Sequence, residues 1–354
     1  MAVGKGIGAH FAAAATRFGI AFTLTILLAS PATKQSLSAS LQPIEDFGPN
    51  RGQLNMYVYI PDGHEPNSTM VVALHGCEQE ATDFDDETGL IALADALKFV
   101  LLFPEQRQAN NDSRCFNWYQ RENNQKDRGE AGSIRNMIQY TIDRYHVDPS
   151  RIFVLGLSAG GSMTAVLMAN YPELFQGGAI IAGTPYECNN PTSWTWAWWW
   201  WLDTWFGDAA AGSYACGLFG YPPTQRSPKA WGDYVRASPG VAPSRWPKIS
   251  LWQGDADNVV NPANQAELVK QWTNVHGIDQ TPDDTDVLNN IRHNVYWDEA
   301  GAPRLETYEI ADLDHAIAVD PGTGPEQCGI TAPYVKDADI CSSLQTLKFW
   351  GVAP

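Results

Sequence analysis

Hydrophobic positions along the chain form short continuous runs that alternate with longer segments of helical period. The continuous runs, each typical of a strand buried on both faces of a sheet, lie at residues 70–74, 99–103, 151–155, 178–182 and 249–252. A run that alternates apolar and polar residues at 56–60 predicts a solvated edge strand, and residues 304–310 predict a late strand. Helices are expected at residues 87–98, 130–145, 262–275 and 342–350. Strands that alternate with helices predict a mainly parallel sheet with helices on both faces, an α/β fold.

The amino-terminal segment is predicted to direct export. Arg17 precedes an apolar run at residues 18–29, and small residues follow at Ser30-Pro31-Ala32, as a signal peptidase requires. The run is shorter than the roughly 20 apolar residues of a membrane span, so we expect no membrane anchor. The resulting assignment is a signal peptide at 1–32, a short leader at 33–41 and a single domain at 42–354, in a protein secreted to the extracellular space or periplasm.

Composition limits the partners of the chain. Its 354 residues carry a formal net charge of −17, and no basic patch is visible. Such a surface repels nucleic acid and anionic lipid, so neither is expected as a partner. Hydrophobic residues make up 44% of the chain, which is enough to bury a sizeable core. We expect a monomer.

The cysteines support an oxidising compartment. They are even in number, lie beyond the proposed cleavage site, and occur at Cys77, Cys115, Cys188, Cys216, Cys328 and Cys341. No C-x-x-C pair occurs, so no metal site is expected. We predict that nearest neighbours along the chain form disulfides, and buried free thiols are the alternative.

The segment between Cys188 and Cys216 is unusually rich in tryptophan. It contains Trp194, Trp196, Trp198, Trp199, Trp200, Trp201 and Trp205. Tryptophan rings offer a large apolar area, so an exposed cluster would contact a flat or apolar substrate. In the alternative interpretation the rings fill a small separate core beneath a long loop. The segment follows a predicted strand, at a place where lids occur, and residues 188–216 are therefore predicted to form a Trp-rich, lid-like insertion.

The most specific pattern in the chain is Gly156-Leu157-Ser158-Ala159-Gly160. It lies between an apolar strand and a helix that begins with small residues. In a G-x-S-x-G elbow the serine occupies a tight strand-to-helix turn that exposes its hydroxyl, and the glycines leave room for it. A Gly/Ser-rich loop without chemistry is the alternative, which the flanking strand and helix disfavour. We predict that Ser158 is the nucleophile of a serine hydrolase.

A serine nucleophile needs a base within reach, and three histidines follow Ser158 at a useful distance. His276 ends a predicted helix, where its side chain is expected to interact with the negative end of the helix dipole. His293 begins a strand after a polar turn and is expected in solvent. His315 directly follows the last predicted strand of the sheet, where catalytic loops lie. We predict that His315 is the base.

The acid that orients the base is expected in the loop after the preceding strand. Residues 254–260 follow that strand and offer two carboxylates, Asp255 and Asp257. Asp255 is close to the strand and is expected to hold loop backbone, whereas Asp257 lies at the tip. We predict that Asp257 completes the triad.

Two backbone N–H groups are candidates for the oxyanion hole. One belongs to Ala159, directly after the nucleophile, and the other to Cys77, in the loop after residues 70–74. Gly76 would allow the close approach of substrate. His75 precedes the nucleophile in an unsuitable position, so we predict that it supports this loop structurally.

Several blocks of the sequence together resemble the secreted esterases of the poly(3-hydroxybutyrate) depolymerase family, which also contains feruloyl and acetylxylan esterases. These blocks are Ala73-Leu74-His75-Gly76-Cys77, Phe103-Pro104-Glu105-Gln106, Cys115-Phe116-Asn117-Trp118, residues 156–163, residues 254–260 and Cys328-Gly329. The resemblance extends from about Phe47 to the carboxyl terminus. It implies an α/β-hydrolase fold and metal-free, cofactor-free hydrolysis of carboxylic esters through Ser158, Asp257 and His315, and it supports Cys77 at the oxyanion hole.

The sequence therefore predicts a secreted serine esterase. The expected substrate is a poly(3-hydroxybutyrate)-type polyester or its oligomers, with the tryptophan segment in contact with the apolar chain. The enzymatic alternative is a feruloyl or acetylxylan esterase. The remote alternative is a catalytically silent hydrolase fold that only binds.

Overall fold

The computed structural model describes residues 41–190 and 212–354. These residues form a ten-stranded sheet with the order β1-β2-β4-β3-β5-β6-β7-β10-β9-β8. The strands are β1 (Gln42–Pro43), β2 (Asn55–Tyr59), β3 (Met70–Leu74), β4 (Val100–Glu105), β5 (Ile152–Leu157), β6 (Gly177–Ile181), β7 (Lys248–Gly254), β8 (Asp284–Leu288), β9 (Ile291–Trp297) and β10 (Pro303–Ile310). The six strands from β4 to β10 along this order pair in parallel, and β1, β2, β8 and β9 pair antiparallel at the two edges.

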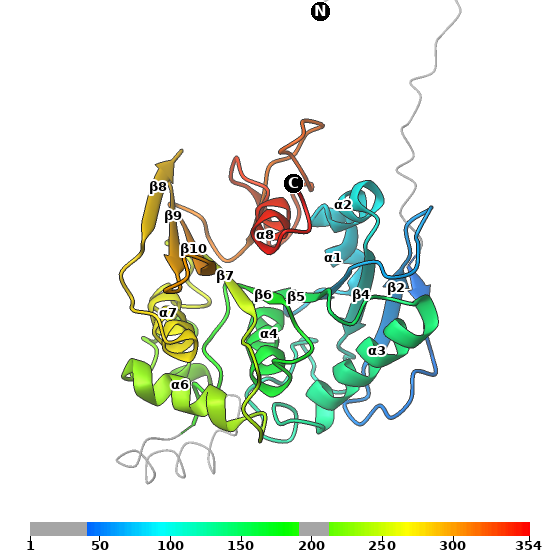
Figure 1. Ribbon diagram of the computed structural model, residues 1–354, viewed down its shortest axis with the longest axis horizontal. Helices are drawn as coiled ribbons and strands as arrows, with labels where there is room; N and C mark the ends of the chain where they lie inside the picture. Colours follow the sequence, from blue (N-terminus) through cyan, green and yellow to red (C-terminus); the bar gives the residue numbers. More distant parts are fainter. Residues whose placement is uncertain (1–40, 191–211) are drawn as a thin grey trace, which may run out of the picture. The chain divides into compact units, whose positions relative to one another are not determined.

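Helices cover both faces of this sheet (Figure 1). One face carries α1 (Ala81–Glu87), α2 (Leu90–Leu97) and α8 (Ser342–Trp350). The opposite face carries α3 (Gly129–Tyr145), α4 (Ala159–Asn170), α6 (Pro228–Ala237) and α7 (Ala263–His276). A separate two-stranded sheet joins β11 (Ile317–Val319) to β12 (Val335–Asp337). The α/β architecture with helices on both faces is the one that the sequence predicted.

Each face of the sheet has its own hydrophobic core, which explains the continuous apolar runs. Every residue of β3, β5 and β6 is buried. Successive side chains of a strand point to opposite faces, so Val72 packs under α3 and α4 whereas Val71 packs under α1 and α2. Trp231 of α6 and Trp272 of α7 are fully buried in the larger core.

Two predicted boundaries are wrong. The strand expected at 99–103 continues through Pro104 to Glu105, and Pro104 pairs with Met56 of β2. The N–H of Val100 points toward β3, and N–H groups alternate in direction along a strand, so an N–H at position 104 would point to the same side. On that side the pairing with β3 has already ended at Leu102. Proline, which has no N–H, therefore breaks no hydrogen bond of the sheet at position 104. The helix expected at 87–98 begins only at Leu90, because Gly89 takes a left-handed conformation (φ 76°) between α1 and α2.

The structure contains three disulfides, with the pairing predicted from neighbour order. Cys77 pairs with Cys115, Cys188 with Cys216, and Cys328 with Cys341, and no described cysteine is free. Closing a loop of this kind stabilises a folded domain by about 2–4 kcal/mol. Among the described residues, none of the helices has the length and apolar character needed to cross a bilayer.

Candidate active site

Ser158 lies at a sharp turn between β5 and α4. Its backbone has φ 56° and ψ −118°, a region that costs a non-glycine residue roughly 1–3 kcal/mol. The turn is held from both sides, because Ser158 N donates to Ile181 O of β6 and Ser158 O accepts from Ser162 N of α4. The side chain is 8% exposed. This is the geometry of a nucleophile elbow.

Two glycines make this turn possible by letting backbone segments touch. A Cβ atom on Gly156 would lie 2.4 Å from the carbonyl carbon and oxygen of Gly160. A Cβ atom on Gly160 would lie 2.2 Å from Leu74 O at the end of β3. The start of α4 is therefore packed directly against the ends of β5 and β3, which brings Ser158 next to the loop that follows β3.

Asp257 and His315 form the second part of the site. His315 Nδ1 lies 2.8 Å from Asp257 Oδ2, and both residues are buried. Asp257 is fixed in turn by Gln253 Nε2, which donates to Oδ2 at 3.0 Å, and by the backbone N–H groups of Val259 and Val260, which donate to Oδ1. A carboxylate in this position orients the imidazole so that Nδ1 carries the proton and Nε2 is left to act as a base.

The other candidate acid has the structural role predicted for it. Asp255 Oδ1 accepts a hydrogen bond of 2.7 Å from Asp312 N, so Asp255 ties the loop after β7 to the loop that carries His315.

Ser158 and His315 line the same cavity of about 230 Å³. We call it the Tyr334 cavity; its other lining residues are Gly76, Cys77, Glu78, Gln79, Ser113, Cys115, Leu157, Phe219, Val259 and Tyr334. Within the part of the chain that the structure describes, the side chains of Ser158 and His315 form no hydrogen bond with one another. Catalytic hydrogen bonds are often long in the absence of substrate and tighten when it binds.

A second cavity of about 250 Å³ meets the first at Ser158. We call it the Trp118 cavity; apart from residues shared with the Tyr334 cavity, it is lined by Asn111, Trp118, Tyr119, Ala159, Ser162, Ser213, Leu218 and Val260. Neither cavity contains a Lys or Arg among its described lining residues. Sequence reasoning missed Glu78, Tyr119, Phe219 and Tyr334, because nothing near them in the chain marks them, whereas Trp118 belongs to a block that carries the family resemblance.

The two predicted oxyanion donors lie at these cavities. Cys77 and Ala159 both line the Trp118 cavity beside Ser158, and their backbone N–H groups have no acceptor among the described residues. Ala159 is the first residue of α4, so the partial positive charge of the helix N-terminus adds to its N–H. An amide without an acceptor at the nucleophile is suited to receive an oxyanion.

His75 and Gln106 support the loop that carries Cys77. His75 Nδ1 donates to Gly76 O at 2.6 Å, and His75 Nε2 accepts from Gln106 N at 3.0 Å. Burial lowers the pKa of His75 to about 4, so the ring is neutral, as this donor–acceptor pair requires. His75 is therefore a structural residue, as predicted.

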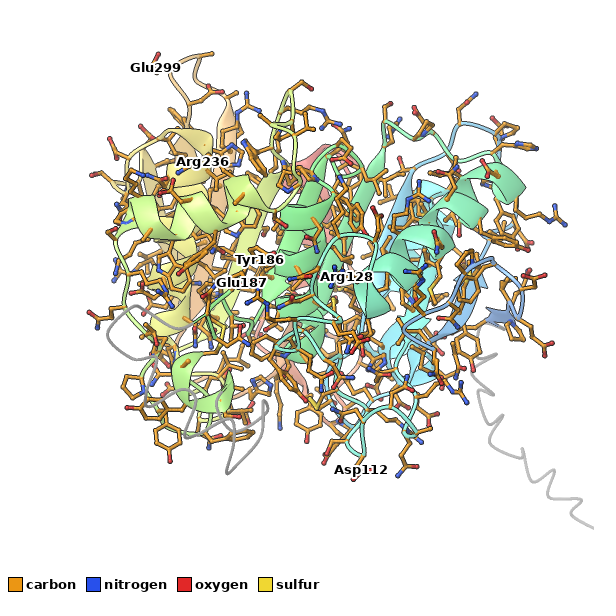
Figure 2. All side chains as sticks on the ribbon, turned by 90° about the horizontal axis from the view of Figure 1, so that it is seen from below. Asp112, Arg128, Tyr186, Glu187, Arg236 and Glu299 are labelled. Carbon is orange, nitrogen blue, oxygen red and sulfur yellow. A yellow bond between two sulfur atoms is a disulfide. The ribbon has the colours of Figure 1, made fainter. Side chains whose placement is uncertain are left out.

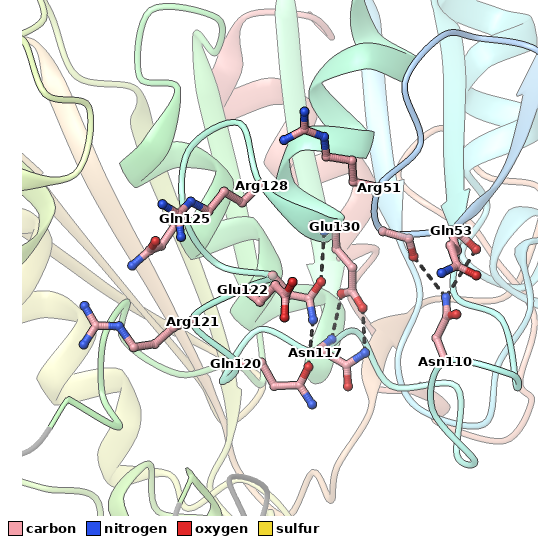
Figure 3. Close-up of a pocket in the computed structure, with 13 residues that line it drawn as sticks. Arg51, Gln53, Asn110, Asn117, Gln120, Arg121, Glu122, Gln125, Arg128 and Glu130 are labelled. Carbon is pink, nitrogen blue, oxygen red and sulfur yellow. Dashed lines mark hydrogen bonds between the residues drawn. The ribbon is translucent and has the colours of Figure 1, made fainter.

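A buried carboxylate continues this support from the start of α3 (Figure 3). Gln106 Nε2 and Asn117 Nδ2 each donate to Glu130 Oε1 at 2.6 Å, and Asn117 N donates to Oε2 at 2.7 Å. Glu130 thereby holds the segment that carries Cys115, the disulfide partner of Cys77. Burial raises the pKa of Glu130 to about 7, although these three donors oppose the shift.

Glu130 also borders a larger, polar cavity of about 980 Å³ (Figure 3). Its rim carries three arginines, Arg51, Arg121 and Arg128, and its lining is otherwise amide, carboxylate and glycine. It lacks Ser158, Asp257 and His315 and has no nucleophile next to a base, so the esterase chemistry belongs to the two smaller cavities.

The remaining predicted residues are not among those that line the two cavities in the described part of the chain. The seven tryptophans of the 188–216 segment (Trp194, Trp196, Trp198, Trp199, Trp200, Trp201 and Trp205) lie outside the described residues. His276 is partly buried, burial lowers its pKa to about 4, and its Nε2 bonds to Pro247 O at 3.0 Å, so it is a neutral packing residue rather than a charged helix end. His293 is only partly in solvent, with 29% of its side chain exposed, because its ring stacks on Tyr308 and its Nε2 pairs with the buried Glu306 at 3.0 Å.

One group of acidic side chains has the spacing of metal ligands. Carboxylate oxygens of Asp320, Asp337 and Asp339 lie within 4.8 Å of one another at the surface near β11 and β12. None of the three lines either cavity at Ser158.

Comparison with known proteins identifies the family. A family model described as "Esterase PHB depolymerase" matches residues 54–189. Poly(3-hydroxyalkanoate) depolymerase C of Paucimonas lemoignei is 40% identical over 331 residues, covering 93% of this chain and 75% of that protein. The chain belongs to the esterase family of the PHB depolymerases.

Other members of this family have different names. Feruloyl esterase B of Talaromyces funiculosus is 29% identical over 84% of this chain and 78% of that protein. Probable acetylxylan esterase A of Aspergillus fumigatus is 28% identical over 87% of this chain and 79% of that protein. The solved structure of an acetyl xylan esterase from Aspergillus awamori superimposes with a TM-score of 0.70 at 23% identity, covering 89% of this chain and all of that one. The predicted α/β-hydrolase fold is thus confirmed.

Proposed function

We propose that this protein is a secreted serine esterase that hydrolyses poly(3-hydroxyalkanoate) chains or their oligomers. The observation that carries the ester chemistry is the Asp257–His315 hydrogen bond at a cavity that Ser158 also lines, next to two amides that have no acceptor in the described part of the chain. The polyester substrate is supported by the 40% identity to the Paucimonas lemoignei enzyme. The three disulfides favour an extracellular location.

In the proposed mechanism, Ser158 Oγ attacks the ester carbonyl while His315 Nε2 takes its proton. Asp257 stabilises the imidazolium that forms, and the N–H groups of Cys77 and Ala159 stabilise the oxyanion, each by about 3 kcal/mol. His315 then protonates the leaving alcohol. Water hydrolyses the acyl-enzyme with the same groups in reversed roles.

The apolar lining of the Trp118 cavity suits a short aliphatic acyl unit. Trp118, Leu218 and Val260 line it, and none of its described lining residues is charged. We place the tryptophans of the 188–216 segment as additional contacts to the polymer chain, which would extend this apolar surface.

A substrate panel on the purified mature protein tests the proposal. We expect release of 3-hydroxybutyrate from the polyester to exceed release of ferulate from methyl ferulate or of acetate from acetylated xylan. Ser158→Ala should abolish all of these activities and also labelling by a serine-directed fluorophosphonate, because both need the same hydroxyl. The feruloyl or acetylxylan assignment replaces ours if those substrates are preferred, and labelling that persists in Ser158→Ala would remove the assigned nucleophile.

A further inference from the structure

The reaction assigns the two cavities at Ser158 to the two halves of an ester. His315 must deliver its proton to the leaving oxygen, so the alcohol portion occupies the cavity that His315 lines, the Tyr334 cavity. The acyl portion occupies the Trp118 cavity, which Ala159 lines and His315 does not. This assignment rests on the function proposed above for Ser158 and His315.

Among the described lining residues, a carboxylate borders the alcohol side only. Glu78 lines the Tyr334 cavity, and its Oε2 accepts a hydrogen bond of 3.0 Å from the Tyr334 hydroxyl. The Tyr334 ring is set edge-on to the His315 ring, with the ring centroids 6.3 Å apart. Glu78 therefore lies on the side of the site where the leaving group departs.

No described cation compensates this carboxylate. Arg114, which follows the lining residue Ser113, already pairs with Glu80, and Lys336, two residues after Tyr334, lies 3.8 Å from Asp314. The described lining of the cavity contains no Lys or Arg. Glu78 is solvent-exposed, so its charge is screened by water, but no described cation neutralises it and it still acts on whatever occupies the alcohol side.

The chemistry of a hydroxyacid polyester makes this charge selective. Inside the chain, the alcohol portion of the cleaved bond continues into another ester and is uncharged. At the carboxyl end, the alcohol portion is a hydroxyacid with a free carboxylate. We propose that Glu78 makes the alcohol side of the site reject a free carboxylate, so that the enzyme cleaves interior ester bonds and leaves the last bond at the carboxyl end.

Two matched substrate pairs test this inference. One pair is the linear dimer of 3-hydroxybutyrate with its terminal carboxyl free or capped as a primary amide. The other pair is 3-acetoxybutyrate and 3-acetoxybutyramide, which are the acetate esters of the same two alcohols. In each pair only the charge of the leaving group changes. The measured quantity is the ratio of kcat/KM for the amide to that for the acid, in which effects common to both substrates cancel.

We expect the wild-type enzyme to prefer the amides and Glu78→Gln to reduce that preference about fivefold, chiefly by faster turnover of the acids. The carboxamide introduced by this substitution keeps an oxygen that can accept the hydrogen bond from the Tyr334 hydroxyl, so this bond is retained while the charge is lost. Raising the salt concentration to about 1 M should also reduce the wild-type preference for the amides, because salt screens the charge of Glu78.

Glu299→Gln is the matched control. Glu299 lies in the turn between β9 and β10, and Figure 2 shows it at the opposite end of the described domain from Asp112, the neighbour of the lining residue Ser113. This variant should keep the wild-type ratio. An amide-to-acid ratio that is the same in Glu78→Gln and wild type overturns the inference.

The acetyl pair separates this result from the assignment of the substrate. Hydrolysis of the acetyl pair without hydrolysis of the dimer amide or of the polyester would reject the polyester function, while the effect of Glu78 would still be measured on the acetyl pair.

Discussion

At the scale of single residues, Asp257 shows how a carboxylate is prepared for one partner. Its Oδ1 is occupied by the N–H groups of Val259 and Val260, and its Oδ2 faces His315 Nδ1 and Gln253 Nε2. The two oxygens thus have separate tasks, since one fixes the loop and the other orients the imidazole. A substitution that changes only the second oxygen tests the orienting role alone.

Asp257→Asn is such a substitution. The remaining oxygen can still hold Val259 and Val260, but an NH₂ group then faces His315 and favours the wrong tautomer of the ring. We expect kcat for p-nitrophenyl acetate to fall by about 10³–10⁴ with little change in folding, as measured by near-UV circular dichroism.

Asp255→Asn is the comparison for this variant. It alters the carboxylate that holds Asp312 N and should cost much less activity. Equal losses in the two variants would mean that Asp257 does not orient the base.

At the scale of elements, the position of Ser158 depends on how closely α4 approaches the sheet. Gly160 lies in the first turn of α4, against Leu74 O and His75 O at the end of β3. That contact places the nucleophile beside the loop of Cys77. A side chain at position 160 would separate the two elements that together form the oxyanion hole.

Gly160→Ala should therefore destabilise the protein, by about 2 kcal/mol or more, and lower kcat, because the new methyl group has only backbone to push against. The gain in helix propensity from Gly to Ala, about 1 kcal/mol, is smaller than this cost. Thermal unfolding and esterase assays measure the two effects.

Gly232→Ala provides a control within another helix. Its Cβ would meet only the ends of the flexible Asn274 and Arg236 side chains, so α6 should gain the helix propensity at little cost. A Gly160→Ala protein as stable and active as Gly232→Ala would contradict the packing argument.

At the scale of the whole molecule, carboxyl groups with raised pKa values contribute to how stability varies with pH. Burial raises the pKa of Glu130 from 4.5 to about 7, and burial also raises the pKa values of Asp85 and Glu87 to about 7. A carboxyl with a higher pKa in the folded state favours folding while it is protonated. That contribution is complete below the pKa of the unfolded chain and is lost as pH rises through the pKa of the folded protein.

Glu130 should therefore lower the free energy of unfolding by about 3 kcal/mol between about pH 4.5 and pH 7, while the lowered pKa values of His75 and His276 act in the opposite direction over this range. Urea unfolding across this range measures it. In Glu130→Gln the free energy of unfolding should fall less, or rise more, from about pH 4.5 to pH 7, because one group with a raised pKa is removed, whereas Glu299→Gln should keep the wild-type slope. A slope unaffected by Glu130→Gln would show that this carboxyl does not carry the shift.

The sequence by itself determined the alternation of strands and helices, the elbow at Ser158 and the order of its partners. These are local signals, because apolar periodicity and glycine spacing follow from the geometry of one segment. The same local reasoning failed at Pro104, whose place in β4 depends on where a neighbouring strand ends, and at His293, whose partner Glu306 lies on another strand.

Only the tertiary structure decided what surrounds the nucleophile. Glu78 and Tyr334 are 256 residues apart in the chain, yet they form a hydrogen bond beside His315. Glu130 supports the loop of Cys77 through Gln106 and Asn117, and no spacing in the sequence announces that contact. The physical reason is that such contacts arise where the carboxyl ends of several parallel strands converge. The strand order that brings those ends together is set by the packing of the whole sheet rather than by any one segment.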